Sequence, residues 1–344
     1  MPHAPLDAWQ VAASTFPHDG TITEKMTFLL RYAVLAPSGH NSQPWVFRIR
    51  GEQIDLLADR RRALPVVDPE DRELTISCGA ALFNLRIAAR HFGYSTTIAR
   101  LPEGGQSDWL ARVICSPGPA ATAQEDRLFE AIPKRRTSRH RFDDRTISPD
   151  IRQALGAAVD AEGACLGWVP DAYRDRVADL VVEGDRLQAR DKRFRRELAA
   201  WLHPNRTRSR DGMPGYGFGL SDLASYMGPF VMRTFDWGKG QAAKDRQLAE
   251  GSPGLAVLGT SEDTPAAWLR AGEALEHMLL LATHHGLCAS YLNQPVEVDE
   301  LRPHLAEVVE PVGHPQLLLR LGYGPEVPHS PRRTAEQVVV PPEH

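Results

Sequence analysis

A short polar turn at residues 36–45 (APSGHNSQPW) brings together two amides, two hydroxyls and an imidazole. Pro37 ends the amphipathic helix expected over 23–35, and Pro44-Trp45 start a strand-like alternation of apolar and polar residues. Such a turn could hydrogen-bond the edge of a polar ring. Taken alone, it could equally be a well-capped connection between a helix and a strand.

A second group with chemical potential lies at residues 135–139 (RRTSR). The guanidinium groups of Arg135, Arg136 and Arg139 and the Thr137 hydroxyl could surround a phosphate dianion with charge-assisted hydrogen bonds. A solvated basic loop or a nucleic-acid contact would have the same composition.

Two further polar segments occur near the end of the chain. One is Leu292-Asn293-Gln294, which follows an apolar helix, and the other is the basic pair Arg332-Arg333 in the tail. Ordinary loop polarity and a solvated tail would also explain them.

Several classes of function are disfavoured by composition. The four cysteines are far apart and show no zinc-ligand spacing, and there is no GxSxG elbow or phosphate-binding GxGxxG. A net charge of −4 argues against a nucleic-acid partner. No apolar run approaches the ~20 residues of a membrane span, and residues 1–20 do not resemble a signal peptide. We therefore expect a cytoplasmic protein with no metal and no membrane partner.

The chain contains an internal similarity. Residues 79–102 and 272–295 align without a gap at a constant offset of 193, with Gly, Ala, Leu, His and Pro recurring at the same places. Each copy reads as a helix closed by a Gly, followed by an extended stretch to a Pro. Either one structural unit occurs twice, or two Ala/Leu-rich helices are similar by chance.

Periodicity predicts mixed α and β content. Helices are expected over 23–35, 78–92, 124–132 and 149–159, in one long stretch from 173 toward 201, and from Pro265 after the cap Thr264; strands are expected over 45–50, 53–57, 109–115, 164–169, 255–259 and 316–322. Residues 203–240, rich in Gly, Pro and aromatics, have no counterpart in the first half and read as a cover for a site.

The strings PSGHNSQPW and RRTSRHRF resemble the nitroreductase-like FMN flavoproteins, and most closely the Acg-like, or twin, subgroup, in which one chain imitates the family dimer. The resemblance implies that the turn contacts FMN, that the arginine loop holds its phosphate and ribityl chain, that the segment after the second helix passes over the flavin ring, and that the basic pair returns to the phosphate. The residues carried over are Pro37, Ser38, Gly39, His40, Asn41, Gln43, Arg135, Arg136, Thr137, Arg139, Leu292, Asn293, Gln294, Arg332 and Arg333.

The resemblance also implies an α+β fold of two pseudo-symmetric repeats, each a mainly antiparallel sheet flanked by helices. The first repeat, 1–125, supplies the turn, and the second, 126–344, supplies the arginine loop and an inserted lid at 203–240. Each half lacks the motif that the other has, so one composite FMN site is expected, with a pseudo-symmetric partner that binds nothing. Such an internal pseudo-dimer would be a monomer.

The implied activity is that of an NAD(P)H-dependent oxidoreductase that passes a hydride through flavin N5 to a flat small molecule, a nitroaromatic or a quinone. No side chain need act as acid or base in this chemistry. The alternative is a protein that stores FMN beneath the lid and has little or no reductase activity.

Overall fold

Two four-stranded antiparallel sheets form the framework of the computed structural model, which describes residues 5–103, 108–234, 238–309 and 312–341. The first sheet has the order β1-β2-β4-β3 and the second the order β5-β8-β10-β9. The bounds are β1 Trp45–Arg50, β2 Gln53–Ala58, β3 Tyr94–Arg100, β4 Trp109–Pro117, β5 Cys165–Trp168, β8 Gly254–Thr260, β9 Cys288–Tyr291 and β10 His314–Gly322. The predicted α+β class is confirmed, and the strand order is the same in the two sheets.

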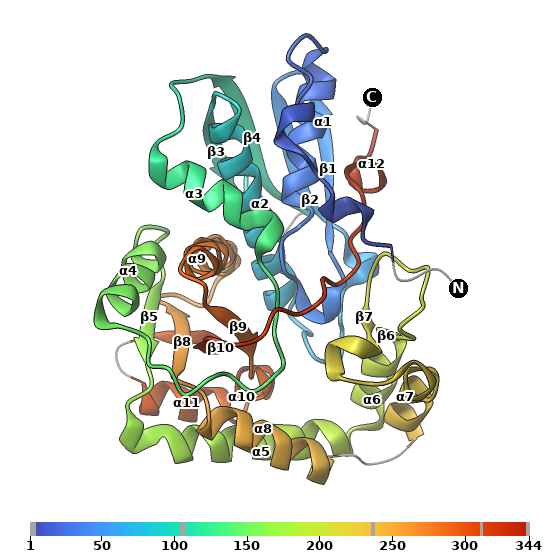
Figure 1. The fold of residues 1–344 in the computed structure, drawn as a ribbon, viewed down its shortest axis with the longest axis vertical. Coiled ribbons are helices and arrows are strands. Elements are labelled where there is room, and N and C mark those ends of the chain that lie inside the picture. Colours follow the sequence, from blue (N-terminus) through green and yellow to red (C-terminus); the bar gives the residue numbers. More distant parts are fainter. Residues whose placement is uncertain (1–4, 104–107, 235–237, 310–311, 342–344) are drawn as a thin grey trace.

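A long helix occupies the same place in each half, between the second and third strands. These helices are α2 (Arg72–His91) and α9 (Pro265–His284), and they pack against each other, with α9 between the two sheets in Figure 1. A Cβ on Gly79 would lie 2.1 Å from the Leu269 carbonyl oxygen, and one on Gly272 would lie 1.9 Å from the Ile76 carbonyl oxygen. Both pairs are related by the offset of 193, so the contact is reciprocal, as at a two-fold axis.

The remaining helices flank this framework. Thr21 starts α1 with a capping box to Glu24, and the Thr264 hydroxyl caps α9 by accepting from the Ala267 amide. Their bounds are α1 Ile22–Ala33, α3 Ala123–Ala131, α4 Pro149–Asp160, α10 Gln294–Glu297, α11 Arg302–Val308 and α12 Ala335–Val338. The helix α1 leads into β1 as α4 leads into β5.

The halves differ most between their first two strands. A tight turn at Gly51 joins β1 to β2, whereas residues 169–253 separate β5 from β8. This insertion contains α5 Arg174–Arg190, α6 Lys192–Ala200, β6 Leu202–His203, β7 Met213–Pro214, α7 Asp222–Thr234 and α8 Gly238–Glu250. It extends beyond the expected lid at 203–240 on both sides, and residues 235–237 of that lid lie outside the described residues.

The expected single helix from 173 toward 201 is wrong, because Asp191 interrupts it. The Asp191 carboxylate accepts a hydrogen bond of 2.7 Å from the Arg193 amide, which caps a new helix, α6. The helices α5 and α8 lie side by side along the lower edge of Figure 1.

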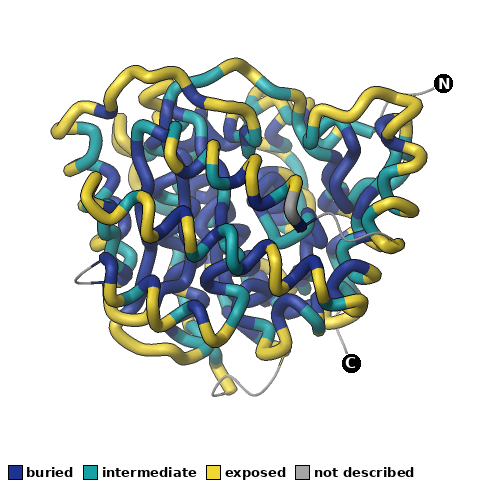
Figure 2. The backbone as a smooth tube through the Cα atoms, turned by 90° about the horizontal axis from the view of Figure 1, so that it is seen from below, coloured by how far each residue is buried: buried dark blue, intermediate teal, exposed yellow. Residues whose placement is uncertain are grey.

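Apolar side chains fill the interior on both sides of the central helices. Trp45, Phe47 and Phe83 belong to the core of the first half, and Met278 and Leu319 to that of the second. Figure 2 shows the buried backbone within a rim of exposed loops. No described helix is long and apolar enough to span a bilayer.

The C-terminal tail leaves the second sheet and returns to the first. Val339 forms a parallel bridge with Phe47, and the Val340 amide donates to the Phe47 carbonyl at 2.8 Å. The Trp9 ring stacks on His329 at 3.9 Å. The tail is therefore fixed beside the turn that follows α1.

We expect Gly79→Ala and Gly272→Ala each to lower the free energy of unfolding by at least about 2 kcal/mol, because an added methyl group cannot fit between packed backbones. Gly156→Ala on α4 is the matched control: its Cβ would meet nothing within 4 Å, so it should stabilise by about 0.5–1 kcal/mol. Urea unfolding measures all three. Equal effects at the three positions would contradict the close crossing.

Candidate functional site

The turn after α1 lines a pocket between the halves and has an unusual backbone. His40, Asn41 and Gln43 have φ angles of 50°, 55° and 53°, in the left-handed region that costs about 1–2 kcal/mol per residue. The Ser38 hydroxyl accepts from the Gln43 amide at 2.9 Å. The Gln43 side chain accepts from the Arg333 amide at 2.8 Å. These bonds hold a conformation that the turn would not favour alone.

Arg332 connects the tail to this turn. Its Nη1 donates to Asn41 Oδ1 at 2.6 Å, while Asn41 Nδ2 donates to the carbonyls of Gly212 at 2.8 Å and Pro331 at 3.0 Å. Arg332 is only 4% exposed and lines the pocket, and its Nε has no hydrogen-bond partner among the described residues. The Nε–H donor is therefore not used by the described part of the chain.

The loop that carries the arginine cluster divides between pocket and interior. Thr137 and Arg139 line the pocket. Arg135 is buried, donates to the Leu35 carbonyl at 3.2 Å and lies 3.6 Å from a Glu276 carboxylate oxygen. Arg136 is held by Glu326 and His329 of the tail.

The segment after β9 forms another wall. Asn293 Nδ2 donates to Glu73 Oε1 at 3.1 Å, and its Oδ1 accepts from the Leu318 amide at 3.1 Å. The Gln294 amide bridges the carboxylates of Asp185 and Asp245 at 3.0 and 2.9 Å. Gln294 therefore links the insertion to the repeated framework.

The expected site residues fall into two groups. Those that line the pocket are Pro37, Ser38, Gly39, His40, Asn41, Thr137, Arg139, Leu292, Asn293, Gln294 and Arg332. Those that lie outside its lining are Gln43, Arg135, Arg136 and Arg333. Gln43 and Arg333 instead anchor the turn from behind.

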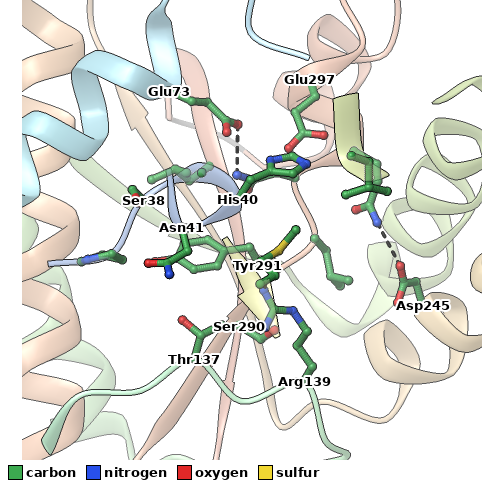
Figure 3. A pocket seen from close by; sticks show the side chains of 18 of the residues that line it. Ser38, His40, Asn41, Glu73, Thr137, Arg139, Asp245, Ser290, Tyr291 and Glu297 are labelled. Atoms are coloured by element: carbon green, nitrogen blue, oxygen red, sulfur yellow. Dashed lines mark hydrogen bonds between the residues drawn. The ribbon is translucent and has the colours of Figure 1, made fainter. Parts of the chain in front are cut away.

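One side of the pocket is cationic and rich in free donors. Burial lowers the pKa of Arg139, and it lowers the pKa of Arg320 to about 10 and of Arg332 to about 9, so Arg320 and Arg332 stay charged at neutral pH. Among the described residues, Arg320 Nε and Nη1 and Tyr291 Oη have no hydrogen-bond partner. Figure 3 shows Arg139 and Thr137 below Tyr291, on this side.

Carboxyl groups face this cationic side. Burial, followed by the charge of Glu297, raises the pKa of Glu73 to about 8, and burial with neighbouring Asp245 raises that of Asp185 to about 8. Burial also raises the pKa of Glu297 to about 7. Figure 3 places Glu73 and Glu297 opposite Thr137 and Arg139, and Asp245 at the side of the pocket. Burial and the charge of Arg139 lower the pKa of His40 to about 4, which keeps its ring neutral.

These carboxyl groups and Arg320 were not predicted from the sequence. Glu73 was missed because α2 begins at Arg72, six residues before the expected start at Cys78. Arg320 did leave a signal, since it is one arginine in the apolar strand LLLRLG. No sequence pattern marks Asp185 and Asp245, because only the packing of α5 against α8 brings them together.

Comparison with known proteins places this geometry in a family. No protein-family model matches the chain. A Mycobacterium tuberculosis protein named "Putative NAD(P)H nitroreductase Rv3131" is 33% identical over 326 residues, which cover 93% of this chain and 92% of that protein. The chain belongs to the nitroreductase family.

A further relative is less similar in sequence. The M. tuberculosis protein named "Putative NAD(P)H nitroreductase acg" is 27% identical over 329 residues, covering 94% of this chain and 97% of that protein. Among solved structures, the FMN and NADPH-dependent nitroreductase NfnB from sphigopyxis sp. strain HMH is similar with a TM-score of 0.41 and 18% identity, over 62% of this chain and 97% of that chain. The expected resemblance to nitroreductases, Acg among them, is confirmed.

The position related to this pocket by the repeat is filled by an ion-pair network. Arg86 Nη1 lies 2.6 Å from a Glu162 oxygen and 2.9 Å from a Glu273 oxygen, and Arg100 makes two further bonds to Glu273, at 2.7 and 2.9 Å. Arg100 is the counterpart of Asn293 at the offset of 193, and Glu162 follows α4 as the polar turn follows α1. In this nitroreductase the charges there neutralise one another.

We expect Glu273→Gln to lower the free energy of unfolding by about 2 kcal/mol, since it leaves partly buried Arg100 without its carboxylate partner and Arg86 with Glu162 alone. Glu336→Gln is the control, because its pair with Arg31 is exposed and should contribute less than about 0.5 kcal/mol. Guanidinium unfolding compares them. A Glu273→Gln midpoint equal to that of the control would show that the network does not hold this region together.

Proposed function

We propose that this chain is an FMN-binding, NAD(P)H-dependent oxidoreductase that reduces a flat electrophile such as a nitroaromatic or a quinone. The observation that carries the proposal is the composite pocket. The polar turn comes from the first half, Thr137 and Arg139 come from the second, and both line one cavity with buried donors that have no partner among the described residues.

The donor set fits FMN. A phosphate and the carbonyl edge of a flavin accept hydrogen bonds, and the pocket offers Arg332 Nε, two nitrogens of Arg320 and Tyr291 Oη without partners of their own among the described residues. The apolar side chains of Ile76, Leu275 and Leu317 in the lining suit a flat ring. We assign the phosphate to Arg332, with Arg135 adding charge from behind.

Bound FMN would supply the hydride chemistry at its N5 position. The chain's contribution is electrostatic and protective. Arg139 and Arg320 place positive charge beside a ring that gains electrons. The Asp185 and Glu73 carboxyls hold protons near neutral pH, because their pKa values are raised to about 8. Neutral His40 adds a polar wall without a competing charge.

The division at residues 125 and 126 supports one site per chain in this proposal. The first repeat contributes the turn and the second the arginine loop, while the pseudo-symmetric position is filled by the network around Glu273. A single chain then replaces the two subunits of a dimer, and we propose that it acts as a monomer.

We further propose that the insertion covers the flavin. Phe218 and Met213 lie within the lid predicted from sequence, and Phe194, Leu198 and Leu248 lie elsewhere in the insertion; all five line the pocket. The Arg139 guanidinium stacks on the Phe218 ring at 4.8 Å. The cover is therefore larger than residues 203–240.

FMN titration tests the function. The chain should bind one FMN, and Arg332→Gln should weaken FMN by about 1.5–3 kcal/mol while changing riboflavin affinity by less than about 0.5 kcal/mol, since riboflavin lacks the phosphate. Glutamine keeps a donor for Asn41, and Arg196→Gln on the exposed side of α6 is the control. Absence of flavin binding would refute the function, and two flavins per chain would refute the composite site.

The cover is tested by Phe218→Ala combined with Met232→Ala, which removes two side chains from the pocket wall. Reduction by NAD(P)H should accelerate at least about threefold, and iodide should quench flavin fluorescence more strongly, because the cover limits access. Leu223→Ala is the control, with a side chain 81% exposed on α7. A rise from near zero would favour the storage protein, and unchanged rates and quenching would place the cover elsewhere.

A further inference from the structure

The insertion, which has no counterpart in the first half, contributes two acidic side chains to the pocket. Asp185 comes from α5 and Asp245 from α8, and Gln294 donates to both from the segment after β9. Gln241 also donates to Asp245, at 2.9 Å. The three residues that meet at the Gln294 amide form what we call the acidic alcove: Asp185, Asp245 and Gln294.

Two acceptors of the acidic alcove are unused. Asp185 is 2% exposed, and its Oδ2 has no hydrogen-bond partner among the described residues; the same holds for Gln294 Oε1. Buried acceptors without donors are rare in folded proteins and call for a bound group. Both residues line the pocket.

Among the described residues, no arginine or lysine forms an ion pair with the acidic alcove. None of the ion pairs within 4.0 Å among the described residues includes Asp185, Asp245 or Glu297. Lys244 and Arg320 act on Asp245 only at longer range, where they oppose the effect of burial on its pKa. A cation that entered would find carboxylates that no arginine or lysine contacts directly.

The apolar side chains near the acidic alcove indicate the shape and polarity of the rest of the ligand. Phe194, Leu198 and Leu248 of the insertion line the same pocket, and they suit a flat apolar body next to a charged end. A primary ammonium carries three N–H donors and so matches two free acceptors. The raised pKa of Asp185, about 8, agrees with a carboxyl pair that keeps a proton until such a cation arrives.

We propose that the acidic alcove is the subsite for a protonated primary amine on the electron acceptor, so that the substrates of this enzyme are flat aromatic molecules with an ammonium group at one end. This inference rests on the proposed function for the electron transfer, but the amine site itself is a binding site that can be measured without turnover.

The test compares two nitroaromatic probes of the same shape, 4-nitrobenzylamine and 4-nitrotoluene, by equilibrium dialysis against the flavin-loaded protein. We expect the amine to bind at least about tenfold more tightly. Asp185→Asn should remove most of that preference and change 4-nitrotoluene affinity less than about twofold. Asp175→Asn, an acid-to-amide change at an exposed position of the same helix, should leave both affinities unchanged.

The possible outcomes separate the two hypotheses. Flavin bound at one per chain with equal affinity for the two probes overturns the amine site and leaves the proposed function standing. Protein that binds no flavin but still prefers the amine overturns the proposed function and supports the amine site. If Asp185→Asn does not fold, as judged by circular dichroism, Asp245→Asn replaces it. A variant that weakens both probes equally also overturns the proposal.

Discussion

The crossing of α2 and α9 at Gly79 and Gly272 is the contact on which the rest of the molecule depends. Two helices approach this closely only where neither has a side chain, and here the missing side chains are equivalent positions of the repeat. The reciprocal contact sets the relation between the two sheets. It also brings Ile76 of α2 and Leu275 of α9 to the wall of one pocket. Site and framework therefore share one geometric constraint.

The same framework leads to opposite electrostatics at its two equivalent positions. In the pocket, Arg320 and Arg332 keep nitrogens to which no described residue hydrogen-bonds. At the other position Glu273 satisfies Arg86 and Arg100 together, and the charges serve stability. A buried charge must be compensated either by the protein or by a bound ligand. In one copy of a duplicated unit the charges can therefore pair with each other, while in the other copy they can remain available for binding.

The insertion changes the character of the remaining pocket. Its helices α5 and α8 add the carboxyl groups of Asp185 and Asp245 to the lining. The pocket lining therefore combines cationic side chains with carboxyl groups, of which Glu73 and Glu297 belong to the repeats and Asp185 and Asp245 to the insertion. Burial keeps the pKa values of the carboxyls high and that of His40 low, which limits the net charge that the fold encloses.

The sequence by itself determined the mixed α and β content and several of the helices and strands, because helix caps, apolar periodicity and the offset of 193 are local or repeated patterns. The two-repeat architecture and the candidate site residues followed from the family resemblance of the turn and the arginine loop. Of the fifteen residues that were expected at the site, eleven line the pocket. Only the tertiary structure decided that Gln43 and Arg333 anchor the turn from behind, and that Asp185 meets Asp245. These last relations join segments far apart in the chain, and their physical cause is packing and burial, which no spacing of residues encodes.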